Sequence, residues 1–327
     1  MGTYSGIPDN TAVSDGVHLL VPFAACAHPA FRDAAHGLKL PHMQRLLRRL
    51  ALEGTDTAGA DSLSAPHERA FGRACGLAAP DGLIPLAALQ VQQAGRDAGT
   101  EGWAWITPAH WRVGRDHIDM APPQELQLDA DDSRALLQAM EPYFREDGIT
   151  LTYDAPLRWL ARGEIFRALP AASLDRVTGR TIDRWMPAGD AGRPVRRLQQ
   201  EMQMLLYTLP LNDARQRGGL LPVNSFWVSG TGALPGPVPA PAGLQVTPYL
   251  RDAALRGDAA AWAAGWQQVD ERDGARLLAE LDRGRAVRVT LCGEAAARTW
   301  SSAAQGGWRR LAGLFARPTP AALLEGL

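Results

Sequence analysis

The sequence predicts an α/β protein with a mixed or parallel sheet flanked by helices, and an α+β subdomain in the middle of the chain. Three observations predict this fold class. Val17–Ala25 and Ala286–Leu291 are apolar runs of the kind that forms buried strands. Leu40–Leu50 has the apolar spacing of an amphipathic helix. In Trp103–Trp111, apolar and polar residues alternate with a period of two, which is typical of a half-buried strand.

The pattern of predicted helices and strands changes twice along the chain and divides it into three parts. Residues 15–100 are expected to form the first part of the α/β core, 101–195 the subdomain, and 196–327 the second part of the core. In the subdomain we expect a helix at Asp131–Phe144, capped by Asp131 or Asp132, and strands at Ile149–Tyr153 and Trp159–Arg162. Ser173–Trp185 is expected to be irregular.

The other expected elements follow the same criteria. His28–Gly37 is expected to be a small-residue linker with irregular turns, Gly54–Asp61 a polar and flexible segment, and Met1–Ser14 a loose leader. Further helices are expected at Ser64–Cys75, Leu83–Gln93, Pro248–Arg256, Ala259–Gln267, Asp273–Leu281 and Trp308–Phe315, with a short strand at Leu244–Val246.

Composition excludes several classes of function. The hydrophobic fraction of 46% is ample for a core, and the net charge of -1 does not suggest a nucleic-acid-binding surface. Cys26, Cys75 and Cys292 are widely spaced, so neither a disulfide framework nor a CxxC metal site is expected. The amino terminus lacks the pattern of a signal peptide, and no apolar run has the length of a membrane span. We therefore expect a cytoplasmic protein without a membrane partner.

The stretch Glu201–Gly232 carries the strongest signal for a binding site. A helix stopped by Pro210 is followed by a polar turn, a strand at Val223–Val228 and the loop Ser229–Gly232. Loops at the carboxyl ends of strands are the usual ligand sites of open α/β sheets. The candidate ligand-binding residues are Asn212, Arg215, Asn224, Ser229, Gly230, Thr231 and Gly232.

Each of these candidates also has a structural interpretation. A guanidinium such as that of Arg215 binds phosphate or carboxylate in a bidentate manner, but it equally pairs with Asp213 or caps the preceding helix. Glycines around Thr231 either expose amides to an anion or simply turn the chain. The stretch contains neither a GxSxG nucleophile elbow nor a P-loop.

A metal site is an alternative for the middle of the chain. Its candidate ligands are His110, Asp116, His117 and Asp119. The two histidines are seven positions apart, which places them on opposite faces of one continuous strand, and hydrogen-bonded structural histidines explain them equally well. Trp103 and Trp105 offer either an aromatic binding surface or core packing.

The segment Trp103–Gly232 closely resembles bacterial proteins labelled RpfE-type regulatory proteins. The resemblance rests on WITPAHWRVGRDHIDM, EPYFREDGI, SLDRVTGRTIDRW, EMQMLLY and NSFWVSGTG. Members of that family are often labelled phosphoglycerate mutase by similarity. The label implies kinship with the archaeal-type cofactor-independent phosphoglycerate mutases and an alkaline-phosphatase-like fold.

A second resemblance links LPLNDARQRGGLLPVNSFWVSGTG to the mutase pattern HPVNxxRxxxGxxxANxxxLRGAG. Leu40–Leu50 similarly resembles the mutase helix TPNLDRLxxxG, with Gln44 in place of its aspartate. Those enzymes carry metal-binding aspartate and histidine residues after the first and the late strand. Here the first strand ends Phe23-Ala24-Ala25-Cys26, and the late strand ends Leu291-Cys292-Gly293-Glu294.

Two hypotheses follow from these departures. Two-metal phosphoryl transfer requires several carboxylates and histidines, so the first hypothesis is a non-catalytic, regulatory protein on a degenerate phosphoglycerate-mutase-like scaffold, a pseudoenzyme without a cofactor. It would bind a small anionic ligand or a protein partner. The alternative is a phosphoglycerate mutase or phosphatase that holds manganese or zinc through rearranged ligands.

Overall fold

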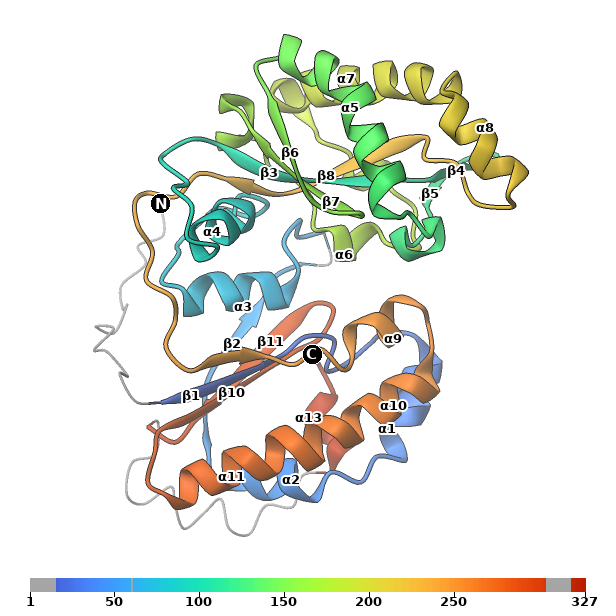
Figure 1. Cartoon of the computed structure of the whole chain (residues 1–327). Coiled ribbons are helices and arrows are strands. Elements are labelled where there is room, and N and C mark those ends of the chain that lie inside the picture. The colour runs from blue at the N-terminus through green and yellow to red at the C-terminus, as the bar shows by residue number, and fades with distance from the viewer. Residues whose placement is uncertain (1–15, 60, 304–318) are drawn as a thin grey trace.

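The computed structural model describes residues 16–59, 61–303 and 319–327, which form two stacked units (Figure 1). The lower unit is built on a five-stranded sheet with the order β2-β11-β10-β1-β9. Its strands are β1 (Val17–Val21), β2 (Ala51–Thr57), β9 (Leu244–Val246), β10 (Val287–Cys292) and β11 (Ala296–Ser301). β1 runs parallel to β9 and β10, whereas β11 is antiparallel to β10 and β2. The predicted mixed sheet is therefore confirmed.

Helices flank both faces of this sheet, as the sequence predicts. One face packs on an apolar core that includes Leu19, Val21, Leu46 and Trp262. The helices on this side are α1 (Pro29–His36), α2 (Pro41–Arg48), α9 (Arg251–Leu255), α10 (Ala259–Gln268), α11 (Ala275–Asp282) and α13 (Pro320–Leu324), with a π-helical turn at Val269–Gly274. α3 (Pro66–Ala74) packs on the opposite face, against β1, β10 and β11 (Figure 1).

The upper unit contains an antiparallel sheet with the order β6-β7-β3-β8. Its strands are β3 (Trp103–Ala109), β6 (Thr150–Ala155), β7 (Arg158–Arg162) and β8 (Ser225–Gly232). On one face, Ile106 and Phe226 pack against α5 (Ala130–Glu146) and α7 (Gly189–Tyr207). On the other face, Trp103 and Leu160 pack against α4 (Leu86–Gln93). Because successive side chains of a strand point to opposite faces, this second face directs Trp105 and Thr107 toward the lower unit.

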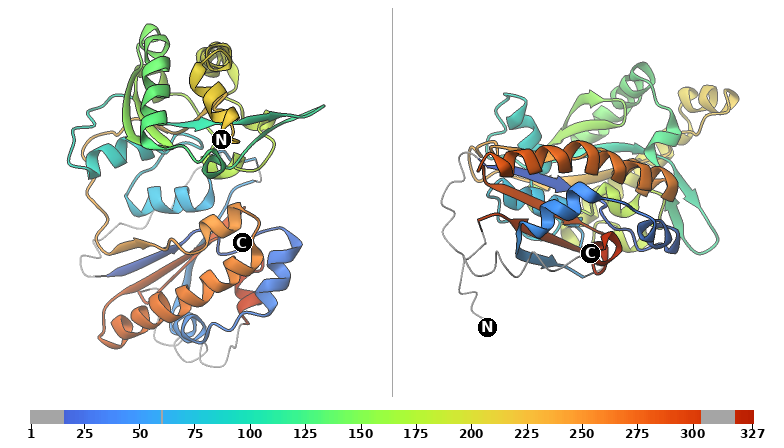
Figure 2. Two further views of the ribbon diagram at one scale, coloured as in Figure 1. Left: turned by 45° about the vertical axis from the view of Figure 1, so that its right-hand side comes forward. Right: turned by 90° about the horizontal axis from the view of Figure 1, so that it is seen from below.

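Shorter elements complete the upper unit. β4 (Trp111–Val113) and β5 (Ile118–Met120) form a separate hairpin. The remaining helical segments are α6 (Leu174–Val177), α8 (Pro210–Arg217) and the short turns Pro123–Leu126, Glu164–Arg167 and Asp183–Trp185. The same stacking of the two units is seen in the left view of Figure 2.

Several local predictions are wrong. His28–Gly37 contains the helix α1, which has Pro29 in its first turn. His28 caps this helix, because its Nδ1 accepts a hydrogen bond from the Ala30 amide. Gly54–Asp61 contributes to β2, because pairing with β11 stabilises a strand that is otherwise polar and exposed. Asp129 caps α5, rather than Asp131 or Asp132.

The stretch Glu201–Gly232 also differs from the prediction. Pro210 begins α8 instead of leading into a polar turn, as suits proline in a first helical turn. The expected loop Ser229–Gly232 belongs to β8, where Ser229 pairs with Trp105 and Gly232 with Trp103. β8 lies beside β3 in the four-stranded sheet, and not in the main sheet.

The chain crosses between the units through two neighbouring segments. The first follows α3 and leads to α4, and the second, residues 233–243, leads from β8 to β9. Gln92 of α4 holds the second crossing through hydrogen bonds with both the amide and the carbonyl of Val238. Cys75 and Gly76 line the same cavity of about 370 Å³ as Pro239 and Ala242, so the two crossings lie side by side.

Two expected elements, Met1–Ser14 and Trp308–Phe315, lie outside the described residues. Within the described part of the chain, none of the helices has the length and apolar character needed to span a bilayer.

His18 of β1 is half-buried, and its Nε2 lies 2.8 Å from Thr290 Oγ1 on β10. Burial, assisted by the charge of Arg288, lowers the pKa of His18 to about 4. The unfolded chain binds a proton at this residue near pH 6.5, so it holds more protons than the folded chain at pH values between about 4 and 6.5. Acidification in this window therefore favours unfolding.

We expect His18→Gln to remove this acid sensitivity, because a glutamine amide can reach the Thr290 hydroxyl but does not titrate. Between pH 7 and pH 5, the wild type should lose about 2 kcal/mol more unfolding free energy than the variant. Urea unfolding at the two pH values measures the difference. Equal losses in both proteins would contradict the assignment.

Candidate functional site

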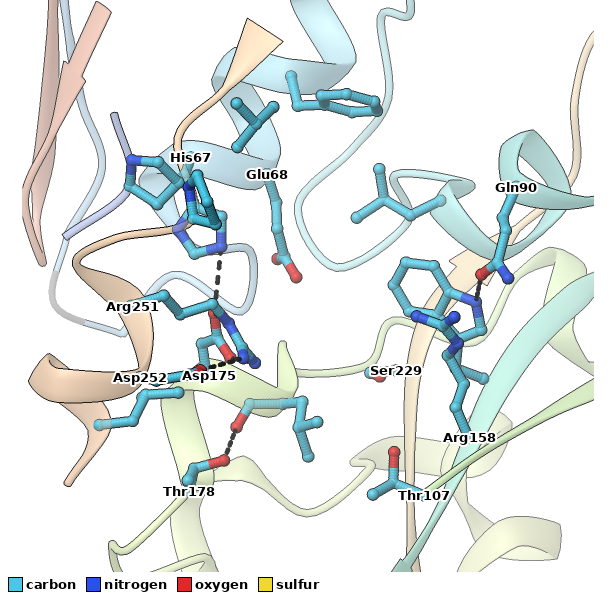
Figure 3. A pocket seen from close by; sticks show the side chains of 18 of the residues that line it. His67, Glu68, Gln90, Thr107, Arg158, Asp175, Thr178, Ser229, Arg251 and Asp252 are labelled. Atoms are coloured by element: carbon cyan, nitrogen blue, oxygen red, sulfur yellow. Dashed lines mark hydrogen bonds and ion pairs between the residues drawn. The ribbon is translucent and has the colours of Figure 1, made fainter. Parts of the chain in front are cut away.

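A cleft of about 910 Å³ lies between the two units (Figure 3). Its lower wall includes the end of β1, the segment after β9 and the start of α9. Its upper wall is formed by β3, β8, α4 and the β6–β7 turn, while α3 and α6 close one side. Many lining residues are apolar, such as Leu86, Leu89 and Leu157. The cleft has the size and character of a small-molecule site.

The upper wall presents two hydroxyl groups to this cleft. Thr107 on β3 and Ser229 on β8 are both buried at the sheet face that carries Trp105. Neither hydroxyl forms a hydrogen bond with another described residue, and Figure 3 shows both side chains at the cleft. They are therefore free, within the described structure, to bond a ligand oxygen.

Arg158 stands beside these hydroxyls on β7. Its Nε donates to Asp154 at 2.7 Å, and Gln90 Nε2 donates to the same carboxylate oxygen at 3.0 Å. Gln90 in turn accepts a 2.7 Å hydrogen bond from the Trp105 indole. This network fixes the direction of Arg158, while neither of its Nη atoms forms a hydrogen bond with a described residue. Such a guanidinium can bind a carboxylate or phosphate.

The opposite side of the cleft is organised by Asp175 of α6. Arg251 of α9 donates to both carboxylate oxygens of Asp175, with an Nε–Oδ2 distance of 2.9 Å. His67 Nε2 lies 3.2 Å from Oδ2 of the same carboxylate. Burial acts to raise the pKa of Asp175, but the contact with His67 and the charge of Arg251 outweigh it and hold this pKa well below its usual range.

Glu68 joins α3 to α6 next to this cluster. Its Oε2 accepts from the Ala65 amide at 3.0 Å, as in a capping box, and its Oε1 accepts from the Ser173 hydroxyl at 2.7 Å. Burial raises the pKa of Glu68 despite the opposing effect of His67. A carboxyl group with a raised pKa in a cleft marks a candidate functional position.

The end of β1 is strained next to the cleft. Phe23 has a φ of 54°, which is rare for a bulky residue, and its ring lies 5.4 Å from the His67 ring. The Phe23 and Ala24 carbonyls accept hydrogen bonds from the indoles of Trp262 and Trp266. Strained backbone persists where its surroundings enforce it, and it clusters at functional sites.

The strand ends do not fit the two-metal centre that the family resemblance implies. Phe23, Ala24 and Cys292 are buried there. Burial, together with Glu294 and against Arg180, raises the pKa of Cys26 to about 12, and burial also raises the pKa of Cys292. Neutral thiols are poor nucleophiles.

Three of the predicted ligand-binding residues form hydrogen bonds with other residues of the upper unit. Asn212 bonds the Leu206 carbonyl and both the amide and the carbonyl of Val223. Arg215 is buried, and donates to Asp132 and to the carbonyls of Leu126 and Leu221. Asn224 bonds the amide and the carbonyl of Trp111. The pairing of Arg215 with Asp213 that the sequence left open is replaced by the contact with Asp132.

Of the four residues Ser229–Gly232, Ser229 lines the cleft. Thr231 is buried and donates its hydroxyl proton toward the carbonyls of Gly82 and Leu169. Gly230 has a φ of 62°, and a Cβ there would lie 2.6 Å from Trp105 Cε3. At Gly232 a Cβ would lie 2.8 Å from the Leu83 carbonyl oxygen. These glycines allow close packing of neighbouring segments.

The four alternative metal ligands do not come together. His110 Nδ1 lies 2.8 Å from the Pro222 carbonyl, whereas His117 pairs with Asp119 on the β4–β5 hairpin at 3.2 Å. Across residues 16–59, 61–303 and 319–327, there is no group of three or more His, Cys, Asp or Glu side chains placed to hold a metal ion.

Sequence reasoning missed His67, Arg158, Asp175 and Arg251. They come from four elements that meet only through the tertiary fold. A local signal existed for one position, since the expected helix start at Ser64–Glu68 already contained His67 and Glu68.

Comparison with known proteins gives distant similarities. The sequence matches no protein-family model and no curated protein sequence. The cofactor-independent phosphoglycerate mutase from Thermoplasma acidophilum is similar in structure, with 12% identity, a TM-score of 0.38, and coverage of 94% of this chain and 95% of the mutase. The PH0037 protein from Pyrococcus horikoshii has 11% identity and a TM-score of 0.47, with coverage of 88% and 87%.

We expect Gly230→Ala to destabilise the protein by about 2–4 kcal/mol, because the variant combines an unfavourable positive φ with overlap against Trp105. Gly76→Ala is the matched control. Gly76 has a φ of 73° but no atom within 4 Å of the added Cβ, so it should cost only about 1–2 kcal/mol. Urea unfolding of both variants provides the measurement, and equal losses would rule out the packing role of Gly230.

Proposed function

We propose that this chain is a non-catalytic, regulatory protein that binds a small amphipathic anion in the cleft between its two units. The observation that carries the proposal is the upper wall, where Arg158, Thr107 and Ser229 offer donors beside an apolar surface. A carboxylate or phosphate ester would bind these donors, and its apolar body would pack on Leu86, Leu89 and Trp105. A cytoplasmic location belongs to the same proposal.

The chemistry of the strand ends supports a role without catalysis. At the carboxyl ends of β1 and β10 lie Phe23, Ala24 and Cys292, and all three are buried. This surface suits packing better than the binding of two divalent cations. The kinship with RpfE-type regulatory proteins and phosphoglycerate mutases, which the sequence motifs suggest, belongs to the proposal as well.

The competing hypothesis is metal-dependent turnover of phosphoglycerate or another phosphoester. Incubation of the purified protein with phosphoglycerate and Mn²⁺ or Zn²⁺ separates the two hypotheses. Our proposal expects no metal-dependent product above the background. Turnover that is lost on chelation and restored by Mn²⁺ would overturn the non-catalytic assignment.

Anilinonaphthalene sulfonate, an amphipathic anion, is a suitable probe of the cleft. We expect Arg158→Gln to weaken its binding about tenfold, which corresponds to about 1.4 kcal/mol and is comparable with one charge-assisted hydrogen bond. A fluorescence titration measures the affinity, and the melting temperature verifies that the variant is folded.

Arg162→Gln is the matched control. Arg162 lies on the same strand, is 46% exposed compared with 48% for Arg158, and also pairs with one carboxylate. It does not line the cleft. If both variants bind the probe with equal affinity, Arg158 is not part of the binding site.

A further inference from the structure

The contact between Arg251, His67 and Asp175 has the composition of an anion-binding site. Arg251 presents a bidentate fork, and His67 adds a third donor nitrogen within 3.2 Å of the bound carboxylate. The anion that occupies the fork is a side chain of the protein itself. Asp175 reaches it from α6, which belongs to the upper unit, whereas Arg251 belongs to the lower unit.

We propose that Arg251 and His67 form an oxyanion site that Asp175 fills in the absence of ligand, and that a carboxylate or phosphate group of the ligand competes with Asp175 for it. The inference rests on the proposed function in one respect, namely that the ligand occupies the same cleft. It adds a second polar anchor, across the cleft from Arg158.

Three observations support the competition. Arg251, His67 and Asp175 all line the cleft, so a ligand can reach the fork without passing through the core. The Arg251 side chain is 35% exposed, whereas that of Asp175 is 6% exposed. Figure 3 shows the carboxylate of Asp175 between His67 and Arg251. A ligand can therefore approach the guanidinium from the open side.

The charges around the fork set the strength of the site. Asp252 also lies near Arg251, at 3.4 Å, and Glu68 lies beside His67 and Asp175. While Asp175 is present, its carboxylate fills the donors of the fork, and the nearby carboxylates of Asp252 and Glu68 add no attraction for a further anion, so a free anion gains little. Asp175 is also tethered, so it competes at a high effective concentration. Its removal leaves Nε and Nη2 of Arg251 without this acceptor.

Occupation of the fork would also affect the joint between the units. α6 is joined to the lower unit not only by Asp175 but also by Arg176, which donates to the Glu294 carbonyl at 2.7 Å. Arg180, which follows α6, donates to the Glu294 carboxylate at 2.9 Å. A ligand that displaces Asp175 removes the part of this joint that faces the cleft. Ligand binding is thereby coupled to the contact between the two sheets.

Asp175→Ala tests the proposal by emptying the fork. The melting temperature is followed during titration with inorganic phosphate or acetate at constant ionic strength. We expect Asp175→Ala to melt below the wild type without added anion, and to be stabilised in a saturable manner at phosphate concentrations at least tenfold lower than any that affect the wild type. A response to acetate as well assigns the fork to oxyanions in general, and a response to phosphate alone assigns it to phosphate groups.

Two further variants make the outcome decisive. In Asp175→Ala/Arg251→Gln the response should disappear. Asp132→Ala, which breaks the Arg215–Asp132 pair outside the cleft, is the control, and phosphate should not stabilise it more than it stabilises the wild type. If Asp175→Ala does not fold, Asp175→Asn replaces it with the same expectation. Equal phosphate responses in the wild type and the Asp175 variant, or persistence without Arg251, would overturn the proposal.

The result is independent of the test of the proposed function. Loss of probe binding in Arg158→Gln concerns the upper wall, whereas the phosphate response concerns the fork. A phosphate response in the Asp175 variant together with unchanged probe binding in Arg158→Gln would support the fork and reject the upper wall as a site. The reverse result would reject the fork alone.

Discussion

The bidentate ion pair between Arg251 and Asp175 joins the two units at the cleft, and the arrangement of the neighbouring groups depends on it. A buried carboxylate is costly unless cations and hydrogen-bond donors compensate for its lost hydration. Asp175 receives this compensation from Arg251 below and from His67 on α3. His67 is thereby oriented, and its ring packs against the strained Phe23 at the end of β1. One carboxylate thus links α6, α9 and α3 and, through His67, the end of β1.

The position of the cleft depends on which faces of the two sheets are covered by packing. The five-stranded sheet uses both faces for packing, and its strand ends carry apolar side chains. The four-stranded sheet buries one face against α5 and α7, and leaves part of the other face over the cleft. Hydroxyl groups on β3 and β8 therefore become available to a ligand. On this side of the cleft, the polar groups thus come from the face of the four-stranded sheet.

Sequence patterns predicted those parts of the structure that depend on local periodicity. The strand at the start of the chain, the helix α2 and the mixed α/β class are examples. β2 could not be predicted, because its polar residues become a strand only by pairing with β11. The same holds for the site. Ser229 was proposed from the sequence as part of a loop, and it lines the cleft as part of β8. Asp175 and Arg251 are 76 positions apart, and no local pattern indicates that they meet.

The proximity of the two crossings between the units has a consequence for how such a protein can change. Because the chain leaves and re-enters the lower unit at the walls of one small cavity, the two covalent connections of the upper unit lie at one place. A short loop could join the two ends of the lower unit at a small entropic cost, and insertions between adjacent chain ends are well tolerated in compact domains. The upper unit can thus be exchanged or enlarged without altering the order of strands in the sheet that carries it.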